Sequence, residues 1–213
     1  GGNISGGDLI PATGTVNYNG TSAQTVKMSN IYQYYNLYLN NSASATLNAN
    51  VTATRVSGDI RVQSGIFSNG GYAIAGVSGK TFELADGATF LLAGTTSAFP
   101  TVFTASLGAL STVEYKGTGN QTVADLASPG YGHLILSISG TKTVAASGTG
   151  LDIRGNVTLN AGITFATRTY THNIGGNCTN NGATVTGNST IKYNGTAAQT
   201  IGGAAATHTF YRI

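Results

Sequence analysis

The sequence predicts an all-β chain wound as a parallel β-solenoid, in which each coil stacks on the coil before it. One phrase occurs three times, as VNYNGTSAQTV at 16–26, VEYKGTGNQTV at 113–123 and IKYNGTAAQTI at 191–201. Short runs in which apolar and polar residues alternate, such as that holding Ile60 and Val62, are typical of strands with one buried face. Asn-Gly, Ser-Gly and Asp-Gly pairs separate these runs and indicate tight turns.

Five residues are identical in the three copies of the phrase. They are Tyr18, Gly20, Thr21, Gln24 and Thr25 in the first copy, Tyr115, Gly117, Thr118, Gln121 and Thr122 in the second, and Tyr193, Gly195, Thr196, Gln199 and Thr200 in the third. The residue before each tyrosine is Asn17, Glu114 or Lys192, so this position is expected to face solvent. The tyrosine is expected to pack inside, and the glutamine to hydrogen-bond the turn backbone. We therefore interpret the phrase as a building unit and not as a ligand site.

The spacing of the copies suggests the size of a coil. The numbers of the three tyrosines differ by 115 − 18 = 97 and by 193 − 115 = 78, and these two intervals differ by 97 − 78 = 19. A coil of about 19–20 residues would make the intervals five and four whole coils, and the chain about eleven coils. A solenoid tolerates the loss of one coil because each coil contacts only its neighbours. We expect one solenoid over residues 1–213, with units starting near 16, 113 and 191, and a right-handed coil by the crossover rule.

Both ends of the sequence resemble interior parts of the repeat. GGNISGGD at 1–8 is similar to GGNCTNNG at 175–182, and FYRI at 210–213 occupies the place of YYNL at 34–37. An open solenoid end leaves unpaired backbone amides and carbonyls. The sequence therefore predicts either a window of a longer repeat array or molecules that associate with themselves end to end.

Composition argues against several classes of partner. Charged residues make up 8% of the chain, and the ten Lys and Arg occur singly, so no basic tract could follow a nucleic-acid backbone. No apolar run approaches the length that a membrane-spanning helix needs, so no membrane span is expected. Cys178 is the only cysteine, which excludes an internal disulfide and a cysteine-based metal site. We expect neither a metal site nor a cofactor.

The ionisable residues do not form a recognisable catalytic pattern. Enzymes that cleave polysaccharides on a β-helix need two or three carboxylates, or a carboxylate and a base, that converge on one face. The candidates are dispersed in the sequence: Asp8, Asp59, Glu83, Asp86, Glu114, Asp125, Asp152, His133, His172 and His208. Coil stacking could bring some of them together, but the sequence predicts no catalytic residue and favours a non-enzymatic protein.

Two other patterns suggest ligands. The run YQYYNLY contains Tyr32, Tyr34, Tyr35 and Tyr38, which could form a stacking platform for a sugar ring, or could simply continue core and surface columns of the solenoid. Thr-x-Thr triplets, such as that at 184–186, would form a flat threonine array if they stacked in register, as in ice-binding solenoids. Their separations are not clean multiples of a coil, so this alternative ranks lower.

The chain also resembles a known class of repeats. At YNGTxAQT, at YYNLYLNN, at SGDIRVQSG and at GGNCTNNGATVTGNSTIKYNGTAAQT it resembles the β-strand repeat arrays of very large secreted bacterial surface proteins. More loosely, it is similar to the solenoids of filamentous haemagglutinin and of autotransporter passengers. Residues 95–111 fit the resemblance poorly, and Cys178 stands where the arrays usually have a large apolar residue. The arrays' export signals and sorting domain lie outside the repeats, and neither is found in this sequence.

The resemblance implies a stalk, an adhesin or an extracellular matrix component. The leading hypothesis is thus a non-enzymatic structural or adhesive segment of a bacterial extracellular or cell-surface fibre, which contacts further copies of itself and, as a second class of partner, surface glycans. The sparse Lys and Arg offer few sites to trypsin-like proteases, which suits an exposed fibre. The alternative is a carbohydrate-binding or carbohydrate-cleaving β-helix, and an ice-binding solenoid ranks third.

Overall fold

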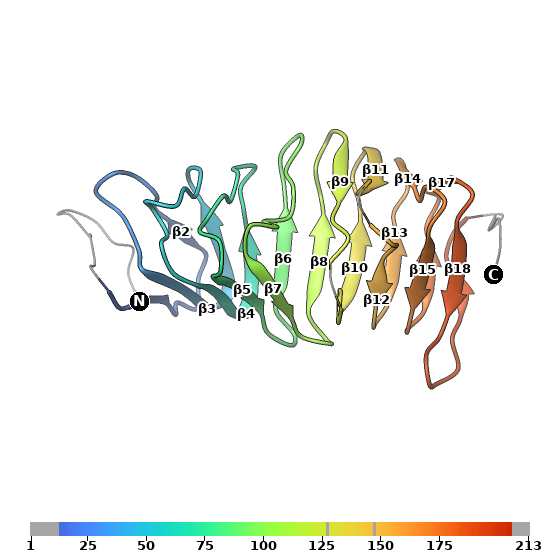
Figure 1. Ribbon diagram of the computed structural model, residues 1–213, viewed down its shortest axis with the longest axis horizontal. Coiled ribbons are helices and arrows are strands. Elements are labelled where there is room, and N and C mark those ends of the chain that lie inside the picture. Colours follow the sequence, from blue (N-terminus) through green and yellow to red (C-terminus); the bar gives the residue numbers. More distant parts are fainter. Residues whose placement is uncertain (1–12, 127, 147, 206–213) are drawn as a thin grey trace.

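The computed structural model describes residues 13–126, 128–146 and 148–205. They form an all-β parallel solenoid of about eight turns, elongated along the axis on which the coils stack (Figure 1). The described residues contain no helix. The fold class predicted from the sequence is therefore confirmed. The end segments 1–8 and 210–213, which resemble the repeat, lie outside the described residues.

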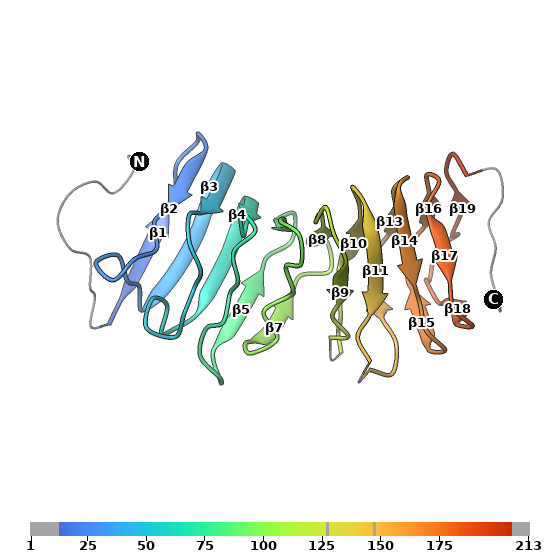
Figure 2. The same cartoon turned by 90° about the horizontal axis from the view of Figure 1, so that it is seen from above.

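The strands form four columns of parallel neighbours, and each of the two longest strands pairs in two columns. Figure 2 shows the strands following one another along the length of the solenoid. The first column contains β1 (Thr15–Tyr18), the starts of β3 (Asn36–Leu47) and β4 (Ile60–Ser68), β5 (Thr81–Leu84) and β7 (Thr104–Leu107). The second contains β2 (Gln24–Val26), the ends of β3 and β4, β6 (Thr89–Leu92), β8 (Thr112–Tyr115), β10 (His133–Leu136), β13 (Val157–Leu159), β16 (Cys178–Asn180) and β19 (Ile201–Gly202). The third contains β9 (Gln121–Val123), β11 (Gly140–Val144), β14 (Ile163–Ala166) and β17 (Thr184–Thr186), and the fourth contains β12 (Asp152–Ile153), β15 (Thr171–Ile174) and β18 (Thr190–Tyr193).

The register of the second column gives the true length of a coil. Eight register steps between paired positions lead from Thr25 in β2 to Gly202 in β19, so the residue number advances by 202 − 25 = 177. One coil therefore contains about 22 residues on average. The expectations of shorter coils, of about 19–20 residues, and of about eleven coils are wrong.

The three copies of the phrase do not lie a whole number of coils apart. Four register steps lead from Tyr18 in β1 to Leu107 in β7, a difference in number of 107 − 18 = 89. A further advance of 115 − 107 = 8 then leads to Tyr115 on β8, in the neighbouring column. The interval of 97 is thus four coils plus one face. The interpretation of the intervals of 97 and 78 residues as whole coils is therefore wrong. Each side of a coil has the same alternation of inward-facing and outward-facing residues, so the two-strand unit of the phrase can stack in more than one column.

A continuous apolar core runs inside the columns. Inward-facing residues such as Leu37, Val62 and Leu84 are fully buried. In the middle of the solenoid, Phe82 and Phe90 lie 4.8 Å apart between ring centroids, and Phe99 packs against both rings at 5.6 and 6.0 Å. Phe99 belongs to the segment 95–111, so the part that fits the repeat poorly contributes a large aromatic side chain to the core.

Polar side chains at the corners connect successive coils. Their oxygen or imidazole nitrogen accepts a hydrogen bond from a backbone amide of the next coil, where the strand ladder begins. Such bonds join Asn36 to the Asp59 amide (3.0 Å), Asp59 to the Thr81 amide (2.9 Å), His133 to the Asn156 amide (2.9 Å), Asn156 to the Asn177 amide (2.8 Å) and Asn177 to the Thr200 amide (2.9 Å). These bonds satisfy amides that would otherwise lack a partner at the turns.

Candidate functional site

Each copy of the repeated phrase builds the same hydrogen-bonded turn. The side-chain oxygen of Gln24, Gln121 and Gln199 accepts a hydrogen bond from the amide of the glycine four residues earlier, at 3.0, 2.8 and 2.8 Å. A Cβ atom on Gly20 or Gly117 would lie 2.7 or 2.6 Å from that glutamine side chain. The glycine and the glutamine therefore recur together because the turn has no room for another side chain.

The tyrosines of the first two copies lie in the core. The hydroxyl of Tyr18 lies 2.7 Å from that of Tyr34, and the hydroxyl of Tyr115 lies 2.9 Å from that of Tyr131. Tyr131 donates its hydrogen to the Ala124 carbonyl at 2.7 Å, and Tyr34 makes the equivalent bond to a backbone carbonyl. Burial raises the pKa of Tyr115 to about 12. In the third copy, Tyr193 on β18 is half-buried. The four tyrosine hydroxyls in the core of the first two copies bond to one another and to backbone carbonyls, so they are not available to a ligand.

A buried lysine supports the turn in the second copy. Lys142 on β11 has no exposed surface, and its ammonium group donates to the Gly117 carbonyl (2.8 Å), the Gly119 carbonyl (3.2 Å) and the Gln121 side-chain oxygen (2.8 Å). In the first copy the Asn41 amide makes the corresponding bonds. Burial lowers the pKa of Lys142 to about 8. In the sequence this lysine is one of ten scattered cations, and its place inside an alternating strand is the signal that it faces inward.

The tyrosine run at 32–38 is divided between the core and the surface. Tyr34 is buried, while the other three rings are half-buried. A cation lies over each of these three: Lys27 over Tyr32 at 5.5 Å, Lys80 over Tyr35 at 5.5 Å and Arg61 over Tyr38 at 4.9 Å from the ring centroid. Cation–π contacts of this kind stabilise a surface by about 0.5–1 kcal/mol each. Each cation covers one face of its ring, on which a sugar could otherwise stack.

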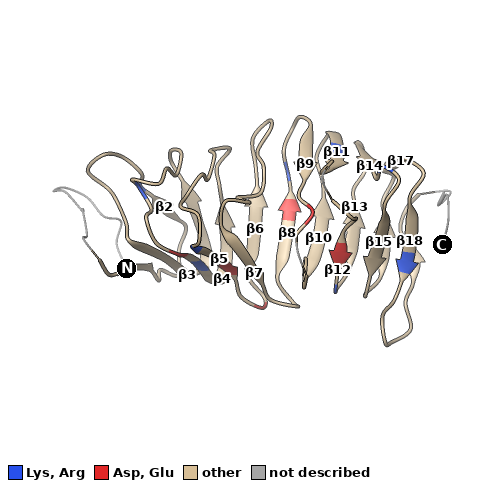
Figure 3. Cartoon of the chain, in the orientation of Figure 1, with Lys and Arg blue, Asp and Glu red and all other residues tan. Residues whose placement is uncertain are grey.

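Most of the charged side chains have structural partners, and charges are sparse along the strands (Figure 3). Arg61 and Glu83, on adjacent strands, form an ion pair of 2.7 Å. Asp86 accepts the Leu110 amide at 2.8 Å. Asp8 and His208 lie outside the described residues. In the part of the chain that the structure describes, no group of three or more His, Cys, Asp or Glu could hold a metal ion.

The two histidines in the described residues, His133 and His172, accept hydrogen bonds from backbone amides. Nδ1 of the buried His172 accepts from the Leu151 amide at 2.9 Å, and its Nε2 lies 2.9 Å from the Thr167 carbonyl. The ring must therefore carry its proton on Nε2. Burial lowers the pKa of His172. Both ring nitrogens of this histidine are thus engaged and neither can act as a base, while His133 likewise uses Nδ1 at a corner.

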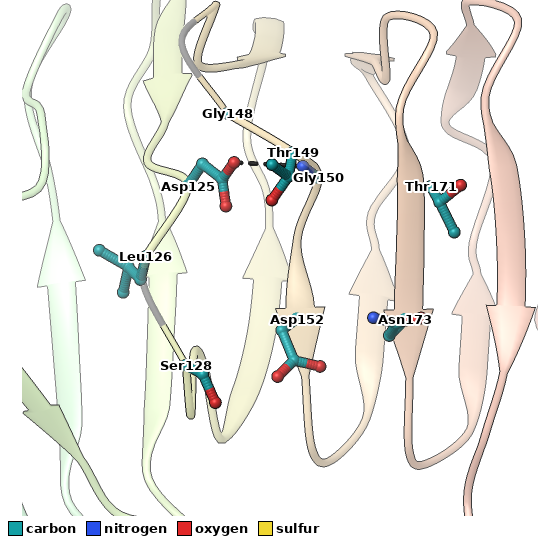
Figure 4. A pocket seen from close by; sticks show the side chains of 9 residues that line it. All are labelled: Asp125, Leu126, Ser128, Gly148, Thr149, Gly150, Asp152, Thr171 and Asn173. Carbon is teal, nitrogen blue, oxygen red and sulfur yellow. Dashed lines mark hydrogen bonds between the residues drawn. The ribbon is translucent and has the colours of Figure 1, made fainter.

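The structure does bring two of the dispersed carboxylates to one cavity. Asp125 follows β9 and Asp152 begins β12, and both line a pocket of about 560 Å³ (Figure 4). One oxygen of Asp125 accepts the Gly150 amide at 3.1 Å. The complete lining is Asp125, Leu126, Ser128, Gly148, Thr149, Gly150, Asp152, Thr171 and Asn173. Two aspartates, three residues with hydroxyl side chains and one asparagine are among these lining residues, so this pocket is the candidate site.

Comparison with known proteins adds no family assignment: no family model, no curated protein and no solved structure matches the chain. The described residues also include no helix long and apolar enough to cross a membrane. The described residues thus form a repetitive parallel β-solenoid, and the pocket lined by Asp125 and Asp152 is its candidate site.

Proposed function

We propose that this chain is a non-enzymatic structural and adhesive segment of a bacterial extracellular or cell-surface fibre. The observation that carries the proposal is the second column, in which nine strands from β2 to β19 pair in parallel without interruption over an apolar core. Every coil offers the next coil the same row of backbone amides and carbonyls. Further repeats in a longer chain, or a second copy of this chain, could therefore continue the stack. Self-association is the proposed partner interaction.

Two further features support a fibre outside the cell. The resemblance to the repeat arrays of secreted bacterial surface proteins favours this location. The chain also has only ten Lys and Arg, and one of them, Lys142, is buried, so trypsin-like proteases would find few accessible sites. A rigid stack held by backbone hydrogen bonds would keep adhesive surfaces at a distance from the cell.

Solution scattering and electron microscopy of the purified chain test the proposal. Eight steps at about 4.8 Å predict a stack about 40 Å long for one copy, and a chain with the repeats duplicated in tandem should be twice as long. Filaments that lengthen with protein concentration would support self-association. A compact particle whose length does not grow on duplication would contradict the fibre, and monodisperse monomers at every concentration would reject self-association. Turnover of any polysaccharide in a hydrolysis screen would reject the non-enzymatic role.

A further inference from the structure

The pocket at Asp125 and Asp152 is a local departure from the repeat. The offset of 97 that superimposes the first two phrases also aligns segments beyond them. For example, the bridge between Tyr34 and Val56 corresponds to the bridge between Tyr131 and Ile153. The first repeat can therefore serve as an internal reference for the second.

The comparison shows that the second repeat has lost apolar side chains where the pocket lies. In the first repeat the aligned positions hold Met28 and Val51, both buried in the core. In the second repeat these two positions are Asp125 and Gly148. A carboxylate has replaced a thioether, and a hydrogen atom has replaced an isopropyl group, so an apolar corner has become a hollow polar one.

The two glycines are required for this hollow. A Cβ atom on Gly148 would lie 1.6 Å from a carboxylate oxygen of Asp125. Gly150 has a φ of +123°, and a Cβ there would lie 1.9 Å from the Thr171 carbonyl. Only glycine fits at both positions. The Gly150 amide also holds the Asp125 carboxylate in place, so the cavity has defined walls.

The lining indicates the chemistry of a ligand. The carboxylates of Asp125 and Asp152 give the cavity a negative charge, and no Lys or Arg is among its lining residues. The hydroxyls of Ser128 and Thr149, together with the Asn173 amide, offer further hydrogen-bond partners. Carboxylates accept strong, charge-assisted hydrogen bonds from an ammonium group. A volume of about 560 Å³ also exceeds what a bare cation would fill.

We propose that this pocket binds a primary ammonium group carried by a small hydroxyl-rich ligand, as in an amino sugar unit of a surface polysaccharide. The charges of the two carboxylates attract the ammonium group, and the ligand hydroxyls contact the Ser, Thr and Asn side chains that line the same pocket. The proposal deepens the adhesive part of the proposed function by naming a ligand class. It does not depend on filament formation, which is measured separately.

Titration of the isotope-labelled full chain, followed by the amide resonances of Gly150, Thr171 and Asn173, tests this proposal. The probes are the trimer of glucosamine, the trimer of N-acetylglucosamine and spermidine, each at pH 6 and low salt. The two trimers carry the same ring hydroxyls and differ in the ammonium charge. We expect saturable shifts of these amides with the glucosamine trimer and affinity at least about tenfold weaker for the acetylated trimer, because acetylation removes the charge. Spermidine distinguishes the source: if it binds as tightly as the glucosamine trimer, the ligand is a polyamine and the hydroxyl contacts are refuted.

The variant Asp152→Asn should weaken binding of the glucosamine trimer at least about tenfold. Asp59→Asn, on the first repeat, is the matched control, because Asp59 is also a corner carboxylate but lies outside the pocket. It should leave the affinity unchanged, and unaltered resonances elsewhere will show that both variants are folded. Equal affinity for the two trimers, no saturable shift at millimolar ligand, or an unaffected Asp152→Asn variant would overturn the proposal.

Discussion

The buried ammonium group of Lys142 predicts an unusual dependence of stability on pH. Its pKa is about 8 in the folded chain and 10.5 in the unfolded chain, because folding removes the group from water. Below pH 8 the lysine is charged in both states, and its burial costs free energy of folding. Between pH 8 and 10.5 the unfolded chain binds more protons than the folded chain, so the free energy of unfolding rises with pH. The lowered pKa corresponds to a cost of about 3 kcal/mol for burying the charged group.

Urea unfolding at several pH values, on the wild-type chain and on Lys142→Met, measures this effect. The variant keeps the length of the side chain but cannot titrate, so the wild-type minus variant difference isolates Lys142. This subtraction matters because the pKa of Tyr115 is raised to about 12, which makes stability fall above pH 10 in both proteins. We expect the difference to rise by about 1.4 kcal/mol for each pH unit above 8. A flat difference between pH 8 and 9.5, or an ammonium group that titrates near 10.5 by NMR, would refute the reasoning.

Three further predictions concern single side chains, each measured by the free energy of unfolding. The pKa of the buried His172 is lowered, so the unfolded chain takes up its proton first and stability should fall as pH drops below 6.5. His172→Gln should reduce this fall, and equal acid sensitivity of the two proteins would contradict the prediction. Tyr131→Phe removes the hydrogen bond to the Ala124 carbonyl and should cost about 1–2 kcal/mol, whereas no loss would show that the pair of hydroxyls is unimportant. Ile138 is exposed with φ at +73°, so Ile138→Gly should stabilise the chain by about 1 kcal/mol, and destabilisation would count against strain at this position.

The fold class followed from the sequence because its causes are local and repeated. Alternation such as that around Ile60 and Val62 indicates which side of a strand is buried, and the glycine and glutamine of the phrase describe a turn that the structure builds three times. The coil length could not be obtained in this way. The phrase specifies two strands and a turn, but not the face of the coil on which they stack, so Tyr18 and Tyr115 could lie in different columns.

The candidate pocket was not found from the sequence, for a physical reason. Asp125 and Asp152 differ in number by 152 − 125 = 27 and line one pocket only because a coil of about 22 residues places their segments beside each other. With coils of about 19–20 residues, the two would have been assigned to unrelated corners. The sequence does contain a signal for the pocket: in the aligned repeats, Asp125 stands where the first repeat has Met28, and Gly148 stands where it has Val51. It becomes interpretable once the register is known.

Disulfide trapping between neighbouring strands tests the central claim, which is parallel stacking with about 22 residues per coil. In a Cys178→Ala background, Glu114→Cys combined with Ile135→Cys places two thiols on directly paired positions of β8 and β10, whose numbers differ by 135 − 114 = 21. The control combines Glu114→Cys with His133→Cys, whose numbers differ by 133 − 114 = 19, which matches the coil length first expected from the sequence. A disulfide needs Cα atoms within about 7 Å. We expect rapid intramolecular oxidation of the 114–135 pair and little of the 114–133 pair; the reverse order would contradict parallel stacking in this register.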